Sequence, residues 1–287
     1  MSEKHHLVPF RALASRSHHG KVVAITGGVR GIGRAIANEL SRFGSYVAVG
    51  DIDRDAVARA GTEPTPVVAH HLDVTDALSF GAFLDKVEST IGPIDVLINN
   101  AGIMPVGRFT EESDEITRRI LGINVYGVML GTKLALPRML SRGQGHIVNI
   151  ASLAGENPTP GLGTYCASKQ AVLGFTEAMR LEHRDSGVRF SAVLPTFTRT
   201  ELIAGTRAPL GLLADPEDVA AAVAALIARP RRRVTVTRAA GVLATFNKLT
   251  PRPLGEFIAR RLGVHTTFLD RVDRDARRGY DDRLRNP

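Results

Sequence analysis

The chain has 287 residues, of which 44% are apolar, and a formal net charge of +8 at pH 7. This size and composition allow one substantial hydrophobic core, so we expect a single domain with extensions. The chain has no uninterrupted apolar stretch of the roughly 18 residues that a membrane-spanning helix needs, and its N-terminus lacks the apolar middle of a signal peptide, so we expect a cytoplasmic protein.

The positive charge is concentrated near the C-terminus. Residues 231–261 contain eight Lys or Arg and a single Glu, whereas the rest of the chain is nearly neutral. A basic segment confined to one region says little about the chemistry of the main domain. The run RPRRR at 229–233 lacks the interleaved aromatic side chains that stack on bases, so we expect no nucleic-acid partner.

Seven short segments rich in β-branched and apolar residues predict buried parallel strands. They lie at 21–26, 46–50, 66–72, 94–99, 146–150, 188–194 and 234–237. Helical stretches separate them, and the best marked begins at Asp215, which is followed by Pro216 and two acids. We therefore predict an α/β fold, a Rossmann-type doubly wound, mainly parallel seven-stranded sheet with helices on both faces and a C-terminal helical tail. Ligands of such sheets bind at the carboxyl ends of the strands.

The first predicted strand runs into a glycine-rich turn, TGGVRGIG, at 26–33. Gly27, Gly31 and Gly33 are placed for a tight turn that opens a helix, whose free N–H groups attract a pyrophosphate. An acid, Asp51, ends the next predicted strand. A glycine turn between a strand and a helix, with an acid after the second strand, predicts a dinucleotide site.

The spacing of this turn, TGxxxGxG, resembles that of the short-chain dehydrogenase/reductase family in its simple, single-domain form. Three further segments match that family in order, namely LDV at 72–74, NNAG at 99–102 and PTFTRT at 195–200. The resemblance implies a dinucleotide-binding and catalytic domain at 20–237, between an N-terminal extension at 1–19 and a basic, partly amphipathic C-terminal extension at 238–287. The cofactor-binding residues that it implies are Gly27, Arg30, Gly31, Ile32, Gly33, Asp51, Asp73, Val74, Asn100, Ala101, Gly102, Tyr165, Lys169, Pro195, Thr198 and Thr200.

Two residues bear on the choice between NAD and NADP. Asp51 can accept hydrogen bonds from the adenosine ribose hydroxyls, whereas its charge would repel the 2′-phosphate of NADP. Arg30 stands at the family position that often meets this phosphate. We weigh Asp51 more heavily, because like-charge repulsion is harder to escape than an optional contact is to forgo. The predicted cofactor is therefore NAD, and NADP is the alternative.

Tyr165 and Lys169 stand four residues apart at the start of a predicted helix, which puts both side chains on one face. A free phenol, with a pKa of about 10, is a poor base at neutral pH. An adjacent ammonium and a cationic nicotinamide ring would both stabilise the phenolate and lower that pKa. Tyr165 then becomes a usable general acid and base.

The family resemblance implies two more catalytic residues. Ser152 follows the strand at 146–150, and the family places its hydroxyl beside the tyrosine, where it holds the substrate oxygen. Asn124 matches the family asparagine that holds a water near the lysine and completes a proton relay, and Lys169 has a second role in binding the nicotinamide ribose. The implied reaction is hydride transfer between nicotinamide and the carbinol carbon of a secondary alcohol.

Two departures from the family pattern affect these expectations. Thr196 replaces the glycine that usually follows the proline of its segment, which would alter how closely the backbone approaches nicotinamide. Residues 238–263 mix apolar side chains with bases and prolines, so they could lie on a membrane surface, fold over the substrate mouth or a partner subunit, or pack as a helix on their own domain. The final segment, 270–287, alternates in charge and lacks apolar periodicity, and we expect it to be exposed or disordered.

The substrate depends on the loops after Gly102, after Ser152 and between Phe197 and Asp215. Their apolar side chains predict a lipophilic alcohol or ketone, such as a sterol, a retinoid-like compound or a fatty compound. These side chains are Ile103, Met104, Leu153, Leu162, Phe197, Leu202, Ile203, Leu210 and Leu212.

The helices expected at about 111–142 and 164–186 carry apolar residues on more than one face, which is more than one sheet face can cover. The family resemblance places a subunit interface on these helices. We predict a homo-oligomer, and we favour a dimer over a tetramer, because the long C-terminal extension replaces the chain end that forms the usual second interface.

Other functions fit the sequence less well. A non-catalytic dinucleotide-binding regulator would normally have lost Tyr165 or Lys169, and both are present. An epimerase or dehydratase of nucleotide sugars would carry TGxxGxxG and a long substrate domain. Paired histidines, such as His70 and His71, have no carboxylate or cysteine partners in metal-site spacing, so we predict no metal.

Overall fold

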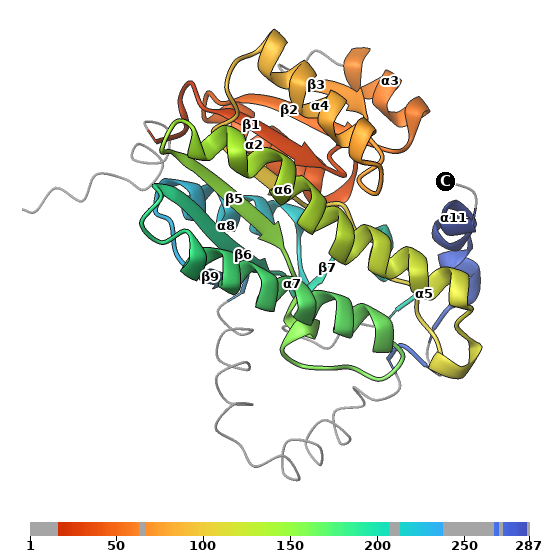
Figure 1. The fold of residues 1–287 in the computed structure, drawn as a ribbon. Helices are drawn as coiled ribbons and strands as arrows, with labels where there is room; N and C mark the ends of the chain where they lie inside the picture. The colour runs from red at the N-terminus through yellow and green to blue at the C-terminus, as the bar shows by residue number, and fades with distance from the viewer. Residues whose placement is uncertain (1–16, 63–66, 207–212, 238–266, 270–271, 286–287) are drawn as a thin grey trace, which may run out of the picture.

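The computed structural model describes residues 17–62, 67–206, 213–237, 267–269 and 272–285 (Figure 1). Its main sheet has the strand order β3-β2-β1-β4-β5-β6-β9, and every neighbouring pair is parallel. The strands are β1 Val22–Thr26, β2 Tyr46–Asp51, β3 Val67–His71, β4 Val96–Asn99, β5 Gly145–Ile150, β6 Val188–Leu194 and β9 Arg233–Thr235. The predicted seven-stranded doubly wound sheet is confirmed, and its order reverses between β1 and β4, the switch point where ligands of such sheets bind.

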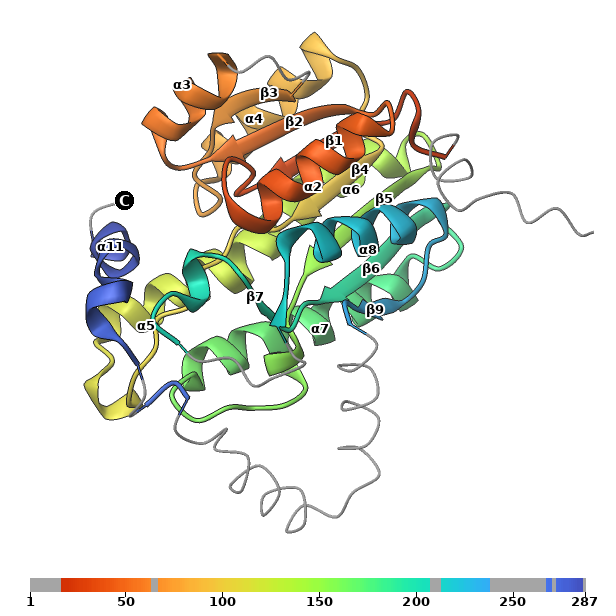
Figure 2. The ribbon, with the colours of Figure 1, turned by 180° about the vertical axis from the view of Figure 1, so that it is seen from behind.

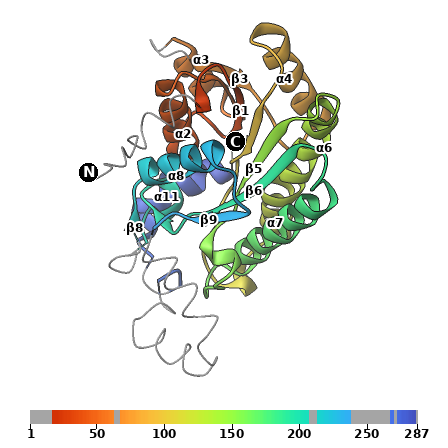
Figure 3. The ribbon, with the colours of Figure 1, turned by 90° about the vertical axis from the view of Figure 1, so that its left-hand side faces the viewer.

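Helices cover both faces of this sheet, as Figures 2 and 3 show. One face carries α2 Gly31–Arg42, α3 Arg54–Thr62 and α8 Pro216–Ala228, and the other carries α4 Ala77–Thr90, α6 Gly127–Leu140 and α7 Gly163–Glu182. Successive residues of a strand enter different cores, so Val23 and Ile25 of β1 pack with α2 and α8 while Val22 and Ala24 pack with α4 and α6. Burial on both faces explains why these strands appear in the sequence as continuous apolar runs.

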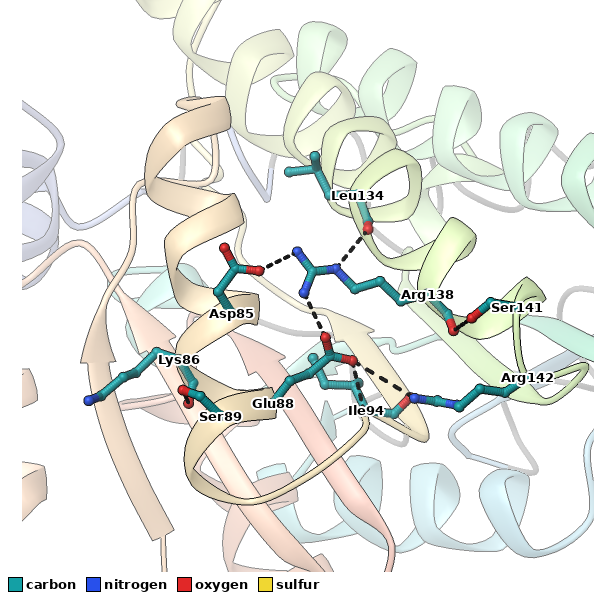
Figure 4. A network of polar contacts seen from close by, with 9 residues as sticks. All are labelled: Asp85, Lys86, Glu88, Ser89, Ile94, Leu134, Arg138, Ser141 and Arg142. Atoms are coloured by element: carbon teal, nitrogen blue, oxygen red, sulfur yellow. Dashed lines mark hydrogen bonds and ion pairs between the residues drawn. The ribbon is translucent and has the colours of Figure 1, made fainter.

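A long helical run, Asp114–Leu140, crosses the second face. It consists of α5 Asp114–Leu121, the π-helical turn η2 Gly122–Tyr126 and α6. By length and composition alone the run could cross a membrane, but half of its apolar window is buried in the protein, as in any core helix. Arg138 ties α6 to α4, because it donates to Asp85 and Glu88 at 2.7 Å each (Figure 4).

Short elements follow the carboxyl ends of the central strands. The loop after β4, residues 100–108, leads into η1 Phe109–Glu111, and η3 Leu153–Gly155 follows β5. The loop after β6, residues 195–206, contains β7 Phe197–Thr198 and η4 Glu201–Ile203, and β7 pairs with β8 Leu213–Ala214. We call these two loops the β4 loop and the β6 loop. Leu210 and Leu212, which were expected at the substrate site, lie outside the described residues.

The expectation that residues 270–287 are exposed or disordered is wrong for one face of the helix that this segment forms. Residues Arg274–Arg285 form a helix, α11, which packs on the domain. Arg277, Tyr280 and Leu284 are buried, and their spacing of three and four places them on one helix face. That face is mostly polar, so it leaves no apolar periodicity in the sequence. The proposed membrane contact at 238–263 lies outside the described residues.

Candidate active site

The glycine turn joins β1 to α2 at the switch point. Gly27 and Gly31 have φ values of 64° and 50°, in the left-handed region that side chains with a Cβ rarely adopt. A Cβ on Gly33 would lie 2.1 Å from the carbonyl oxygen of Gly27, so the helix start and the turn are in direct contact. Gly28 was not singled out in the sequence, and a Cβ on it would lie 2.4 Å from the Cβ of Val49 in β2. Within the part of the chain that the structure describes, the N-cap residue of α2, Arg30, makes no side-chain capping hydrogen bond, which leaves the first N–H groups of the helix for a ligand.

The NNAG turn after β4 braces the glycine turn from behind. The side-chain amide of Asn100 donates to the carbonyl oxygens of Thr26 and Gly27, at 2.9 Å each. The backbone N–H groups of Asn100 and Ala101 both bond the Thr26 hydroxyl at 3.0 Å. Asn100 therefore acts by positioning the turn.

The adenosine end of the predicted site contains two acids. Asp51, at the end of β2, accepts from the N–H groups of Val29 and Asp53, and burial raises the pKa of its carboxyl group. Asp53, which the sequence analysis missed, forms an ion pair with Arg30. The hydrogen bond from the N–H of Ala56 is the main reason that the pKa of Asp53 lies below its usual range, and the Arg30 pair adds to it. The charge of Arg30, the residue expected to meet a 2′-phosphate, is thus already paired with a carboxylate of the protein.

The remaining predicted cofactor residues lie along the same sheet edge. Asp73 holds Thr75 through both the N–H and the hydroxyl of that residue, at 2.8 and 2.7 Å. Val74 is buried against Gly127 at the start of α6. In the β6 loop, the Thr200 methyl group would lie 3.3 Å from a Cβ on Gly31, so this loop closes onto the glycine turn.

The predicted catalytic side chains come together at the carboxyl end of β5. Tyr165, in the first turn of α7, is hydrogen-bonded to Ser152. The Lys169 Nζ lies 5.7 Å from the centroid of the Tyr165 ring and donates to the carbonyl oxygen of Ile150 at 2.9 Å. A Cβ on Gly102 would lie 3.3 Å from Asn124 Oδ1 and 3.5 Å from Lys169 Nζ, so that asparagine and the lysine flank one glycine.

Asn124 owes its position to the π-helical turn η2, where it is fully buried. Its Oδ1 accepts from the N–H of Ile103 at 2.9 Å, and its Nδ2 donates to the Ile103 carbonyl oxygen at 2.9 Å and to the Ser168 hydroxyl at 3.1 Å. A π turn inside an α-helix commonly marks a functional position. Here it aims Asn124 at the β4 loop beside the lysine.

In the protein without a bound cofactor, burial is the largest influence on the pKa values of Tyr165 and Lys169. It raises the pKa of Tyr165, and the hydrogen bond to Ser152 acts in the opposite direction. It also lowers the pKa of Lys169 to about 8. The pKa of the Tyr165 phenol is therefore raised within the protein alone, contrary to the expected lowering, and a phenolate here needs further positive charge.

Apolar side chains enclose the tyrosine on the substrate side. Buried Met104, Leu162, Cys166 and Phe268 form one cluster with Tyr165. Phe197, Leu202 and Ile203 of the β6 loop pack against that cluster. Of the predicted lining residues, Met104, Leu162, Phe197, Leu202 and Ile203 belong to it, whereas Phe268 was not anticipated.

Comparison with known proteins gives consistent matches. A family model described as short chain dehydrogenase matches residues 21–210. The chain is 38% identical over 218 residues to meso-2,3-butanediol dehydrogenase of Serratia marcescens, covering 72% of this chain and 86% of that protein. It is 35% identical over 215 residues to 2,5-dichloro-2,5-cyclohexadiene-1,4-diol dehydrogenase LinX of Sphingobium indicum, covering 70% and 86%.

Solved structures match the fold as well. A short chain dehydrogenase/reductase from Burkholderia phymatum in complex with NAD superposes with a TM-score of 0.73 at 27% identity, covering 81% of this chain and 94% of that one. The 3-ketoacyl-(acyl-carrier-protein) reductase from Brucella melitensis complexed with NADH gives a TM-score of 0.71 at 28% identity, covering 76% and 97%.

Proposed function

We propose a reaction for this chain from the premise that it belongs to the short-chain dehydrogenase family. The reaction is the NAD(H)-dependent interconversion of a secondary alcohol and a ketone. The observation that carries it is the hydrogen-bonded pair of Ser152 and Tyr165, with Lys169 beside the tyrosine ring. An oxidoreductase that moves a hydride needs one group to move a proton at the substrate oxygen, and this pair supplies it.

Three observations favour a nicotinamide dinucleotide at the switch point. Gly27 and Gly33 are in contact and carry no side chains, so the turn offers bare backbone to a pyrophosphate. Asp51 is a half-buried carboxylate placed to accept from ribose hydroxyls. The buried hydroxyl oxygen of Thr196 has no partner among the described residues, so it has a hydrogen bond to give to a bound group.

Asp51 and the ion pair between Arg30 and Asp53 favour NAD over NADP. A 2′-phosphate beside Asp51 would meet a like charge, and Arg30 would have to leave Asp53 to compensate. The two solved structures described with NADH and NAD support the same choice.

Each catalytic side chain has a distinct task in this proposal. A nicotinamide bound at the switch point would supply the hydride chemistry at the carbinol carbon. Tyr165 gives its proton to the substrate oxygen or takes one from it, while the Ser152 hydroxyl holds that oxygen in place. Lys169 lies close enough to stabilise the phenolate, and Asn124 holds Ile103, and with it the β4 loop, beside the lysine.

The apolar cluster around Tyr165 favours a lipophilic alcohol or ketone. Two relatives are named for diol substrates, which agrees with oxidation of an alcohol carbon. The test is NADH formation by the purified full-length protein on a panel of secondary alcohols, repeated with NADP. Turnover with NAD that Tyr165→Phe abolishes is the expected result, whereas absence of turnover on every alcohol with both cofactors would favour a binding role.

A homodimer is the second part of the proposal. Leu121, Tyr126, Met129 and Leu140 on the run α5–η2–α6, and Leu181 on α7, are large apolar side chains exposed in the single chain. A partner copy packed on these helices would bury them. Light scattering on the full-length protein is expected to give a dimer, and a monomer would contradict the assignment.

A further inference from the structure

The helix α11 lies at the carboxyl edge of the sheet, beside α5 and the β6 loop (Figures 1 and 2). Arg119 of α5 donates to the carbonyl oxygen of Leu284, and Arg283 pairs with Glu201 of η4. This helix lies beyond residues 21–210, which match the family model, so that match assigns it no role. Its contacts reach both loops that flank the catalytic tyrosine.

Arg277 links those two loops. Its side chain is 1% exposed, and it donates to the carbonyl oxygen of Met104 in the β4 loop. It also donates to the carbonyl oxygens of Leu202 and Ala204 in the β6 loop, at 2.8 and 3.3 Å. Asp281, one helical turn later, accepts from its Nε at 3.1 Å. A buried guanidinium is tolerated only when it is paired and hydrogen-bonded, so these contacts depend on both loops staying in place.

Tyr280 adds a second tie to the β4 loop. Its hydroxyl accepts from the N–H of Met104 at 2.9 Å, and its ring lies 4.7 Å from the Arg277 guanidinium carbon. The backbone N–H and carbonyl groups of Met104 are therefore both bonded by α11. Because the Met104 side chain is part of the cluster around Tyr165, α11 fixes a residue that touches the catalytic tyrosine.

The segment 267–269 closes the same side. Phe268 is buried in the cluster with Tyr165, and its ring stacks on Phe197 at 5.6 Å between centroids. Two glycines leave room for this closure, and both have positive φ. A Cβ on Gly161 would lie 2.5 Å from the Phe268 carbonyl oxygen, and a Cβ on Gly205 would lie 2.2 Å from that of Asp273.

We propose that α11 and Phe268 form a fixed wall of the substrate site, that Arg277 is the positioning residue that holds this wall against both loops, and that the wall restricts the enzyme to compact secondary alcohols and ketones. The proposal rests on the proposed function and narrows its substrate class. It replaces the sterol, retinoid-like and fatty candidates with smaller molecules.

The size limit follows from what surrounds the tyrosine. Tyr165 is 7% exposed, and the side chains that cover it come from the β4 loop, the start of α7 and Phe268. A long alkyl chain attached to the reacting carbon would have to displace Phe268 or separate α11 from the loops. Separating α11 would break the hydrogen bonds from Arg277 to the carbonyl oxygens of Met104, Leu202 and Ala204 and leave the guanidinium with Asp281 alone, which is strongly unfavourable in a buried site.

The experiment compares Arg277→Ala with Arg278→Ala, a control on the same helix. The Arg278 side chain is 70% exposed and forms an ion pair with Asp275, on its own helix. For each protein, kcat/KM is measured for 2-alkanols from 2-butanol to 2-decanol. Arg277→Ala is expected to raise the ratio of 2-decanol to 2-butanol by about tenfold or more, because a pocket gains selectivity of that order from each methylene it accepts or excludes. Arg277→Lys, which keeps the charge but loses the planar fork, is expected to give a smaller rise.

A second measurement does not depend on activity. Amide hydrogen exchange at Met104 reports directly whether α11 holds the β4 loop, and it is expected to quicken in Arg277→Ala and Tyr280→Phe but not in Arg278→Ala. An unchanged selectivity ratio in an active, folded Arg277→Ala enzyme would overturn the wall, as would unchanged exchange at Met104. If the wild-type protein oxidises no alcohol, the proposed function fails, and the exchange at Met104 still decides whether α11 holds the loop.

Discussion

The nucleotide side and the substrate side of this site are held in place by different kinds of contact. At the switch point, glycine turns touch backbone to backbone, and Asn100 braces the turn of a neighbouring strand through two carbonyl oxygens. On the substrate side, the side chains of Arg277 and Tyr280 bond loop residues 73 to 176 positions earlier in the chain. The nucleotide side should therefore be sensitive to a single added methyl group, and the substrate side to the loss of a single polar side chain.

Tyr165→Phe should have the largest effect, and it should separate chemistry from cofactor binding. Turnover is expected to fall by roughly a hundredfold or more, because the proton donor is lost. The dissociation constant of the cofactor should stay the same, since the ring and its packing remain. Tyr46→Phe is the control, because Tyr46 is 58% exposed on β2. Unchanged turnover in Tyr165→Phe would rule out this mechanism.

Gly33→Ala should give the reverse pattern. The added Cβ would meet the Gly27 carbonyl oxygen and the Asn100 amide, and neither can move far. Overpacking of this kind costs roughly 1–3 kcal/mol, so cofactor affinity should fall by about tenfold to a hundredfold. In Gly81→Ala, where nothing lies within 4 Å of the added atom, titration of the cofactor should give the wild-type affinity. Equal affinities in the two variants would show that the turn can relax.

Asp51→Ala should change the preference between NAD and NADP more than it changes the turnover rate. Removing the carboxylate deletes the charge that opposes a 2′-phosphate, so the ratio of kcat/KM for NADP over NAD should rise by about tenfold or more. Adding Asp53→Asn should raise it further, since Arg30 is then free to pair with the phosphate. A wild-type enzyme that already prefers NADP would show that Arg30 outweighs Asp51.

The smallest expected effect is a pH dependence of stability at Lys169. Burial lowers its pKa in the folded protein to about 8, against about 10.5 when unfolded, so the unfolded chain binds more protons between these values. Stability should therefore rise from pH 8 to pH 10, by on the order of 1 kcal/mol relative to Lys169→Met. Denaturant unfolding of both proteins at the two pH values measures this difference. A difference that stays constant would mean that Lys169 is hydrated in the folded state.

The sequence predicted the sheet and much of the nucleotide side, because the information there is local. The strands are continuous apolar runs, and Gly27, Gly31 and Gly33 lie within seven residues of one another. Tyr165 and Lys169 could be paired for the same reason, since one helical turn separates them. Gly28 and Asp53 were missed although they lie in the same segments, because their partners, Val49 and Arg30, come from the other strand and the other turn.

The substrate side could not be predicted in this way. Arg277 and Tyr280 occur in a segment of alternating charge, where a buried face made of polar groups looks like a solvated one. Their partners are backbone atoms of Met104, Leu202 and Ala204. Every residue has such atoms, so the sequence does not indicate which of them will accept a hydrogen bond. The burial of one face of the segment 270–287 was therefore not predicted. The cofactor and catalytic assignments, made residue by residue, remain predictions that the variants above test.

The place of α11 after every other described element in the sequence also bears on synthesis. Every residue of the sheet, the glycine turn and the catalytic tyrosine leaves the ribosome before residues 274–285 do. A nascent chain can thus assemble its nucleotide side while the substrate side still lacks its last wall. If the proposed wall exists, a frameshift or early stop after β9 would remove it, and we expect Tyr165 of the shortened chain to be open to larger molecules.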